Sequence, residues 1–228
     1  MDDLNFQFIN KFCAPIIFIF LIIMISSSRS VLAQTNRTLP VDSLPTIIQL
    51  FDGKSLNGWE KSDFGTQGPV YVSDGVIILG MGEGCTGIRW EGDFPRVNYE
   101  VSLEAMRVEG YDFFCGMTFP VKKDPCTLIV GGWGGTVVGL SSIDGLDASE
   151  NSTSTMRPFQ NNRWYKIRLR VTSDSIRAWI DGRNVVDFEI DDHKLSIRPE
   201  VELSKPFGIT SWYTTAALRN IRLKLLKK

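Results

Sequence analysis

The chain has 228 residues, of which 43% are hydrophobic and 22% are charged, and its formal net charge is −1 at pH 7. This composition is typical of a globular protein with a sizeable core and excludes a disordered chain, and the length fits one large β domain better than two. A nearly neutral protein has no long-range field to attract phosphates or anionic lipid, which argues against a nucleic acid as its main partner.

The first predicted element is an export signal. Residues 14–25 form an apolar run that is too short to cross a bilayer, which takes about 20 residues. The sequence VLA at 31–33 then offers the small residues that a signal peptidase requires, so we expect cleavage between Ala33 and Gln34. The acidic residues at positions 2 and 3 are atypical of such a signal, and an uncleaved anchor is the alternative. The sequence thus predicts a periplasmic or extracellular protein with no membrane contact after cleavage.

A polar tether and a folded β domain are predicted next. Residues 34–46 contain two prolines and few apolar side chains, which is typical of a linker, and we expect the domain over residues 47–228. Apolar and polar residues alternate in most segments of this domain, most clearly over 99–105, 165–171 and 221–225. Such strands belong to antiparallel sheets with one face in the core.

Turn signals support this interpretation. Asp-Gly or Asn-Gly pairs start at positions 52, 57, 74 and 181, where glycine tolerates the positive φ of a tight hairpin. No apolar pattern of helical period continues for three turns after residue 47. The predicted fold class is therefore all-β, a two-sheet antiparallel sandwich.

The segment at 50–59, LFDGKSLNGW, resembles the opening signature of the family called domain of unknown function 1080, also labelled 3-keto-disaccharide hydrolase. Further similar segments follow in the family's order, namely DGV at 74–76, YEV at 99–101, RWYKI at 163–167 and LRNIR at 218–222. The resemblance spans residues 47–225. It implies a concanavalin-like or LamG-like jelly roll with one concave face, and a secreted domain that hydrolyses or cleaves 3-keto-glycosides.

Two central segments depart from the family pattern. YDFFCGMTF at 111–119 stands where members carry a GNSG segment, and LIVGGWGG at 128–135 replaces an E-x-Q-I-x-D strand. A non-catalytic carbohydrate-binding module is therefore the alternative function, and a scaffold domain without a small ligand is a third. In each of the first two cases the expected partner is a carbohydrate.

An acidic loop provides the candidate catalytic residues, Asp144, Asp147 and Glu150. Hydrolysis of a glycoside needs two carboxyl groups, and the lyase route implied by the resemblance needs a base and an acid, one of them with a raised pKa. The alternatives are an ordinary exposed turn and a calcium site, although the spacing is not that of a recognised calcium loop. No cofactor and no metal site are expected, and His193 is expected in a solvated turn.

The remaining candidates are aromatic residues, for sugar stacking or the core, and cysteines, for a disulfide or buried thiols. Trp133 and Trp212 are predicted to stack on sugar rings, with Ser142 as a third substrate-binding residue, whereas three tryptophans are expected in the core: Trp59, Trp90 and Trp164. Trp179 is predicted on the polar side of its strand, facing either ligand or solvent. After cleavage the chain keeps three cysteines, for which a Cys115–Cys126 disulfide and three buried thiols are both open: Cys85, Cys115 and Cys126.

Overall fold

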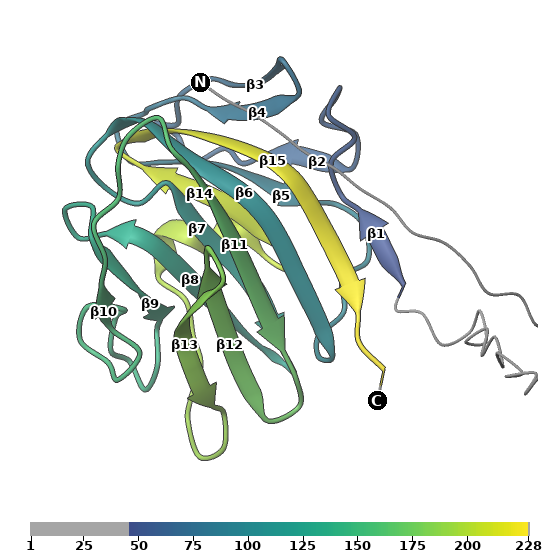
Figure 1. The fold of residues 1–228 in the computed structure, drawn as a ribbon, viewed down its shortest axis with the longest axis vertical. Coiled ribbons are helices and arrows are strands. Elements are labelled where there is room, and N and C mark those ends of the chain that lie inside the picture. Colours follow the sequence, from purple (N-terminus) through teal and green to yellow (C-terminus); the bar gives the residue numbers. More distant parts are fainter. Residues whose placement is uncertain (1–45, 228) are drawn as a thin grey trace, which may run out of the picture. The chain divides into compact units, whose positions relative to one another are not determined.

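The computed structural model describes residues 46–227 and confirms the all-β sandwich, with two antiparallel sheets packed face to face (Figure 1). The expected signal segment, its cleavage point and nearly all of the linker lie outside the described residues. Within residues 46–227, no helix is long and apolar enough to cross a membrane.

The larger sheet has eight strands, in the order β13-β12-β11-β6-β15-β4-β3, with β1 paired to β15. The long strands β6 and β15 pair with each other near its middle. The strands of this sheet are β1 (Ile47–Gln49), β3 (Val70–Ser73), β4 (Val76–Leu79), β6 (Tyr99–Gly110), β11 (Trp164–Val171), β12 (Ser175–Ile180), β13 (Arg183–Glu189) and β15 (Thr214–Leu225).

The smaller sheet has seven strands, in the order β10-β9-β8-β7-β14-β5-β2. A 3-10 helix, η2 (Pro199–Ser204), packs against β5 and β14. The strands of this sheet are β2 (Trp59–Lys61), β5 (Cys85–Trp90), β7 (Cys115–Val121), β8 (Asp124–Gly132), β9 (Val137–Ser141), β10 (Thr155–Met156) and β14 (Gly208–Trp212).

The core lies between the sheets, where the alternation of the sequence placed it. On β6 as far as Arg107, and along β11, every second residue is buried, and the buried Tyr99 hydroxyl donates a hydrogen bond of 2.6 Å to the Pro120 carbonyl oxygen. Ile221 and Leu223 of β15 are buried as well, whereas Leu225, at the end of the strand, is 37% exposed. Burial of one face of each long strand thus determines which face of each sheet is left outside.

Two of the predicted turns close hairpins. Asp74 and Gly75 join β3 to β4, and Asp181 and Gly182 join β12 to β13. All four residues have positive φ, between 50° and 80°, which is the backbone conformation of the tight turns that match strand twist.

The expectation for the core tryptophans is confirmed for one and wrong for another. Trp59 is buried and donates from Nε1 to the Leu50 carbonyl oxygen at 2.7 Å, and Trp90 packs edge-on against it while only partly buried. Trp164 instead lies outside the larger sheet, with the Arg219 guanidinium 4.0 Å from its ring centroid. Because Tyr165 points into the core, the alternation turns Trp164 outward.

The three cysteines of the domain are free and buried, so the disulfide alternative is wrong. Cys126 lies opposite Phe119, and Cys115 lies opposite Val130, so the register of β7 and β8 keeps the two thiols apart. Burial raises the pKa of both thiols to about 12, which keeps them protonated and unreactive.

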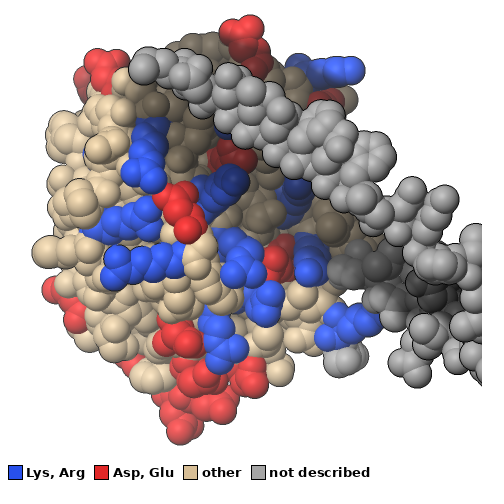
Figure 2. Space-filling model, viewed as in Figure 1, with Lys and Arg blue, Asp and Glu red and all other residues tan. Residues whose placement is uncertain are grey.

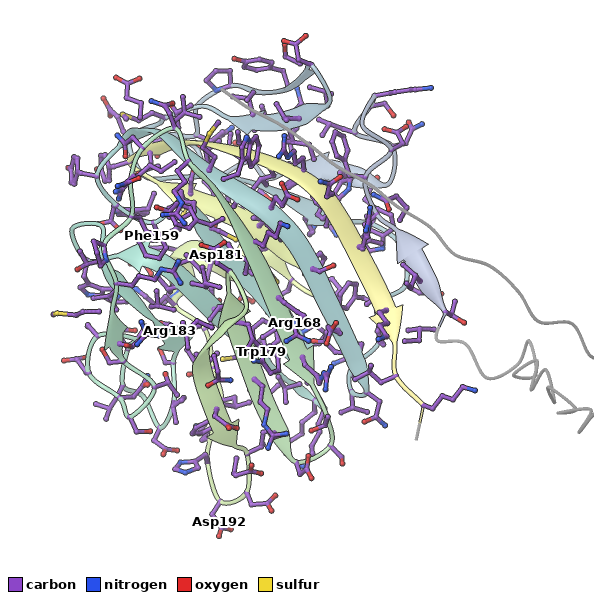
Figure 3. All side chains as sticks on the ribbon, in the orientation of Figure 1. Phe159, Arg168, Trp179, Asp181, Arg183 and Asp192 are labelled. Atoms are coloured by element: carbon purple, nitrogen blue, oxygen red, sulfur yellow. The ribbon has the colours of Figure 1, made fainter. Side chains whose placement is uncertain are left out.

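The outer face of the larger sheet is polar and rich in cations. Figure 2 shows lysine and arginine side chains gathered there with acidic side chains among them. Arg168 and Arg170 both pair with Glu100, and Arg168 also lies 3.8 Å from the centroid of Trp179, beside it in Figure 3. Trp179 is therefore covered by a cation that is itself paired with a carboxylate, which is the arrangement of a solvated sheet surface.

Candidate functional site

A pocket of about 200 Å³ opens on the outer face of the smaller sheet. Its floor comes from β5, β8, β9 and β14, and its walls come from the segments that precede β7, follow β8 and include η2. The residues that line it are Cys85, Asp112, Phe113, Thr127, Ile129, Trp133, Ser141, Arg198, Glu200, Val201 and Trp212.

Glycines on this face let the walls lie directly on the sheet. A Cβ at Gly139 of β9 would come within 3.0 Å of the Ala148 carbonyl oxygen, and one at Gly208 of β14 would come within 2.7 Å of the Ser204 carbonyl oxygen. A Cβ at Gly208 would be closer to backbone than real Cβ atoms come, and one at Gly139 would be tight enough to make its neighbour shift, so larger residues would push these segments away. Between the two covering segments the floor stays open as the pocket.

The two tryptophans predicted as sugar platforms line the same pocket. Trp133 is 41% exposed and has a φ of 47°, an unusual backbone conformation for a bulky residue. Trp212 is stacked with Phe113, with 6.4 Å between ring centroids and 23° between ring planes, and Tyr213 meets its edge at 5.2 Å. The fold therefore brings together two aromatic residues that lie far apart in the sequence.

The loop that carries Trp133 is held from two sides. Asp112 accepts the backbone N–H of Phe113 at 2.7 Å and that of Gly134 at 3.1 Å. The buried Arg107 donates to the carbonyl oxygens of Gly135 at 3.4 Å and Phe159 at 2.6 Å, and its Nε donates to an Asn161 side chain at 2.7 Å. These bonds fix the Trp133–Gly134 peptide and the Gly135 carbonyl group that follows it.

The opposite wall carries a charged cluster. Arg198 donates from Nε and Nη2 to the two carboxylate oxygens of Glu200, at 3.3 and 2.9 Å, and from Nη1 to Asp147. The bonds from Arg198 hold the pKa of the Glu200 carboxyl below its usual range. Glu200 is therefore an ionised carboxylate in the pocket wall.

Cys85 lies at the floor of the pocket but is not an activated nucleophile. Burial, with the nearby Glu200 carboxylate as a second cause, raises the pKa of its thiol to about 12. A neutral thiol is a weak nucleophile, so Cys85 contributes shape and apolar surface to the floor.

Of the three predicted acidic residues, only Asp147 contacts residues that line the pocket. Asp147 accepts the hydroxyls of Ser141 and Ser142 on Oδ1, at 3.1 and 3.0 Å, and contacts Arg198 through Oδ2. Ser141 and Arg198 line the pocket, so Asp147 supports two lining residues from behind. Ser142, the third predicted binding residue, lies in this supporting layer and not in the lining.

Asp144 and Glu150 lie outside this cluster. The Asp144 side chain is 46% exposed and accepts from His193 Nδ1 at 2.7 Å and from the Lys194 backbone N–H at 2.8 Å. The His193 hydrogen bond lowers the pKa of Asp144, the opposite direction from the raised pKa expected of a catalytic acid. Glu150 is exposed and contacts the backbone N–H of Asp147 at 3.4 Å.

The carboxylates of the acidic loop do not converge as the ligands of a calcium ion would. Asp144 and Asp147 hydrogen-bond to different partners, His193 and Arg198. Over residues 46–227 there is no cluster of three or more histidine, cysteine, aspartate or glutamate side chains that could hold a metal ion.

Several lining residues were not among the sequence candidates. They lie in the segment before β7 and in or just before the 3-10 helix η2, where no strand alternation or motif marks them, and only the fold brings them to one place. These residues are Asp112, Phe113, Arg198, Glu200 and Val201.

Comparison with known proteins agrees with the fold and with the resemblance of the sequence. A putative glycosyl hydrolase from Parabacteroides distasonis is 14% identical with a TM-score of 0.52, covering 79% of this chain and 94% of its own. The carbohydrate-binding module CBM66 from Bacillus subtilis is 16% identical with a TM-score of 0.50, covering 72% and 94%. A Crh5 transglycosylase is 13% identical with a TM-score of 0.53, covering 81% and 85%.

These likenesses show a shared jelly-roll fold, because the identities are low. A search of curated proteins found no match. The family described as "3-keto-alpha-glucoside-1,2-lyase-like domain" matches residues 46–224, nearly all of the described part, and the chain therefore belongs to this family.

Proposed function

We propose that the pocket on the smaller sheet binds one sugar unit of a glycan. The observation that carries this proposal is the convergence of Trp133 and Trp212 on one pocket, beside the polar groups of Asp112, Arg198 and Glu200. Apolar walls with a few placed polar groups are typical of small-molecule sites, and the C–H face of a pyranose packs well on an indole. The apolar segment at 14–25 supports the further proposal that the domain acts after export.

Glycoside cleavage is the second candidate function. The family match supports it, and so does the presence of two carboxylates, Asp112 and Glu200, in the lining. Glu200 would remove the proton beside a keto group, as a lyase mechanism requires. Its lowered pKa makes it a weak base, which is the reason for ranking binding first. The earlier candidate Asp147 would act in this scheme only by positioning Arg198 and Ser141.

The binding proposal is tested by shortening the two tryptophans. Trp133→Ala and Trp212→Ala should each weaken glycan binding by about 1 to 3 kcal/mol, the cost of truncating an important aromatic contact. Ligands are first identified on a glycan array with the purified domain, and affinities are then measured by calorimetry. Trp179→Ala, which removes a tryptophan from the opposite sheet, is the matched control and should bind as the wild type does. Unchanged affinity in both pocket variants, with the fold intact, would contradict the proposal.

The cleavage candidate has its own test. The wild-type domain is incubated with 3-keto-glucosides and with their parent disaccharides, and released sugar is followed. If Glu200 is the base, turnover occurs and Glu200→Gln lowers it by about 100-fold or more. A wild-type domain that binds these sugars without releasing product would eliminate this second function and leave binding.

A further inference from the structure

The charge of the pocket is the starting point. Two carboxylates, those of Asp112 and Glu200, line the pocket together with one guanidinium, that of Arg198, and Asp147 contacts Arg198 from behind the lining. Arg198 already donates from Nε and Nη2 to Glu200 and from Nη1 to Asp147. An acidic sugar would therefore meet a cation that is already paired with two carboxylates, and a further carboxylate, that of Asp112, in the same pocket.

Asp112 differs from the other two carboxylates because it forms no ion pair with any residue that the structure describes. Its hydrogen bonds come from the backbone N–H groups of Phe113 and Gly134. Arg107 contributes a favourable charge interaction with Asp112 but donates its hydrogen bonds to carbonyl and amide oxygens instead. A carboxylate without a direct counter-ion is thus present in a pocket that receives ligand.

Aromatic rings complete the arrangement. Phe113, Trp133 and Trp212 line the same pocket as Asp112. Cations are attracted to the faces of aromatic rings, and tryptophan is the strongest partner. Aromatic walls with one carboxylate lacking a counter-ion are a combination suited to an ammonium group.

We propose that the sugar unit taken by this pocket carries a free amino group, whose ammonium is bound by Asp112 while the ring stacks on the tryptophans. This inference rests on the proposed function, because it names the class of sugar bound at the same site. The same charge arrangement disfavours uronic acids and sulfated sugars.

The first experiment changes the ligand and leaves the protein intact. Purified domain is applied to a glycan array that contains amino, neutral and acidic sugars, before and after chemical N-acetylation of the array. Glycans with free amino groups should be the strongest binders, and N-acetylation should weaken them by about tenfold or more, as expected for the loss of a charge-assisted hydrogen bond.

The outcomes separate this inference from the proposed function. Strong binding of neutral or acidic glycans that N-acetylation does not change would overturn the amino-sugar inference and retain sugar binding. An array with no bound glycan would overturn both.

The second experiment changes the protein. Asp112→Asn should remove most of the preference for the amino form over the N-acetylated form of the same glycan. Asp192→Asn is the matched control, because Asp192 is exposed in the turn after β13 (Figure 3) and has a φ of 65° that asparagine tolerates. Tryptophan fluorescence and thermal unfolding check that Asp112→Asn leaves the Trp133 loop in place. A folded Asp112→Asn domain that keeps the full preference would overturn the assignment of Asp112.

Discussion

At the scale of single residues, Arg198 controls the charge state of the pocket wall. Its guanidinium contacts both Glu200 oxygens, and this contact lowers the pKa of the carboxyl. A lowered pKa in the folded protein means that the ionised form is stabilised by folding. The contribution is present above the pKa of the unfolded chain and is lost as pH falls through the folded pKa.

This leads to a pH-dependent prediction. In wild-type protein Glu200 should titrate below its reference value of 4.5, and Arg198→Gln should return the pKa towards that value. The variant should consequently lose less stability than the wild type when the pH falls below about 4.5. Carbon-detected NMR of the carboxyl groups and urea unfolding across pH measure the two effects.

Arg177→Gln is a suitable control for that titration. Arg177 is also a partly exposed arginine with two carboxylate partners, Asp187 and Glu189, on the larger sheet. It should leave the Glu200 titration unchanged. A Glu200 pKa that is the same in wild type and in Arg198→Gln would show that another group holds the carboxyl ionised.

At the scale of elements, the loop between β8 and β9 depends on the other sheet. Arg107 belongs to β6, but its Nη1 reaches the Gly135 carbonyl oxygen beyond the end of β8. A Cβ at Gly135 would lie 2.6 Å from this nitrogen, so glycine is needed for the approach. Through this contact the larger sheet positions Trp133 on the smaller one.

Arg107→Met should therefore damage both stability and binding. The change leaves the acceptors at Gly135, Phe159 and Asn161 without their donor, and we expect a loss of about 2 to 4 kcal/mol in the free energy of unfolding. Binding through Trp133 should weaken as the loop loses its support. Urea unfolding and calorimetric titration with a glycan ligand provide the two readouts.

The comparison variant is Arg168→Met, on the outer face of the larger sheet. Glu100 keeps its ion pair with Arg170, so this change should cost no more than about 1 kcal/mol, and glycan affinity should not change. If Arg107→Met were as mild as this control in both readouts, the loop would not depend on Arg107.

The elements differ in how far the sequence predicts them. Strands such as 99–105 and 165–171 were predictable because each has one buried and one outer face. Apolar and polar residues therefore alternate along their sequence. The sequence singled out Trp133 and Trp212, which the fold brings to one pocket, and their contact with sugar stays a prediction. Asp112 and Glu200 were not predictable, because one lies in a connecting segment and the other in a short 3-10 helix, and only the pairing of distant strands brings both to one pocket.

The alternation also fails to say which outer face carries a pocket. The polar face of residues 165–171 is a solvated surface, whereas the opposite sheet holds the pocket because glycines such as Gly139 and Gly208 let other segments lie on it. The acidic loop was a reasonable catalytic candidate by composition. Its carboxylates instead divide between Arg198, His193 and solvent, an outcome that local sequence does not encode.

At the scale of the whole molecule, the proposed export can be tested with the intact chain. Expression in a bacterial host should yield a protein that begins at Gln34, as mass spectrometry of the N-terminus would show. A protein that retains residues 1–33 and sediments with membranes would favour an anchor instead.

The position of β15 in the larger sheet has a consequence for biosynthesis. This strand is the last in chain order, yet it pairs with β6, β4 and β1, which come from the beginning and middle of the domain. The ribosome therefore releases β6 and β4 long before their common neighbour exists, and their edges stay open until residues 214–225 emerge. Sheets closed by such distant partners form slowly. A nascent chain that still lacks its final strand therefore leaves the edges of β6 and β4 unpaired.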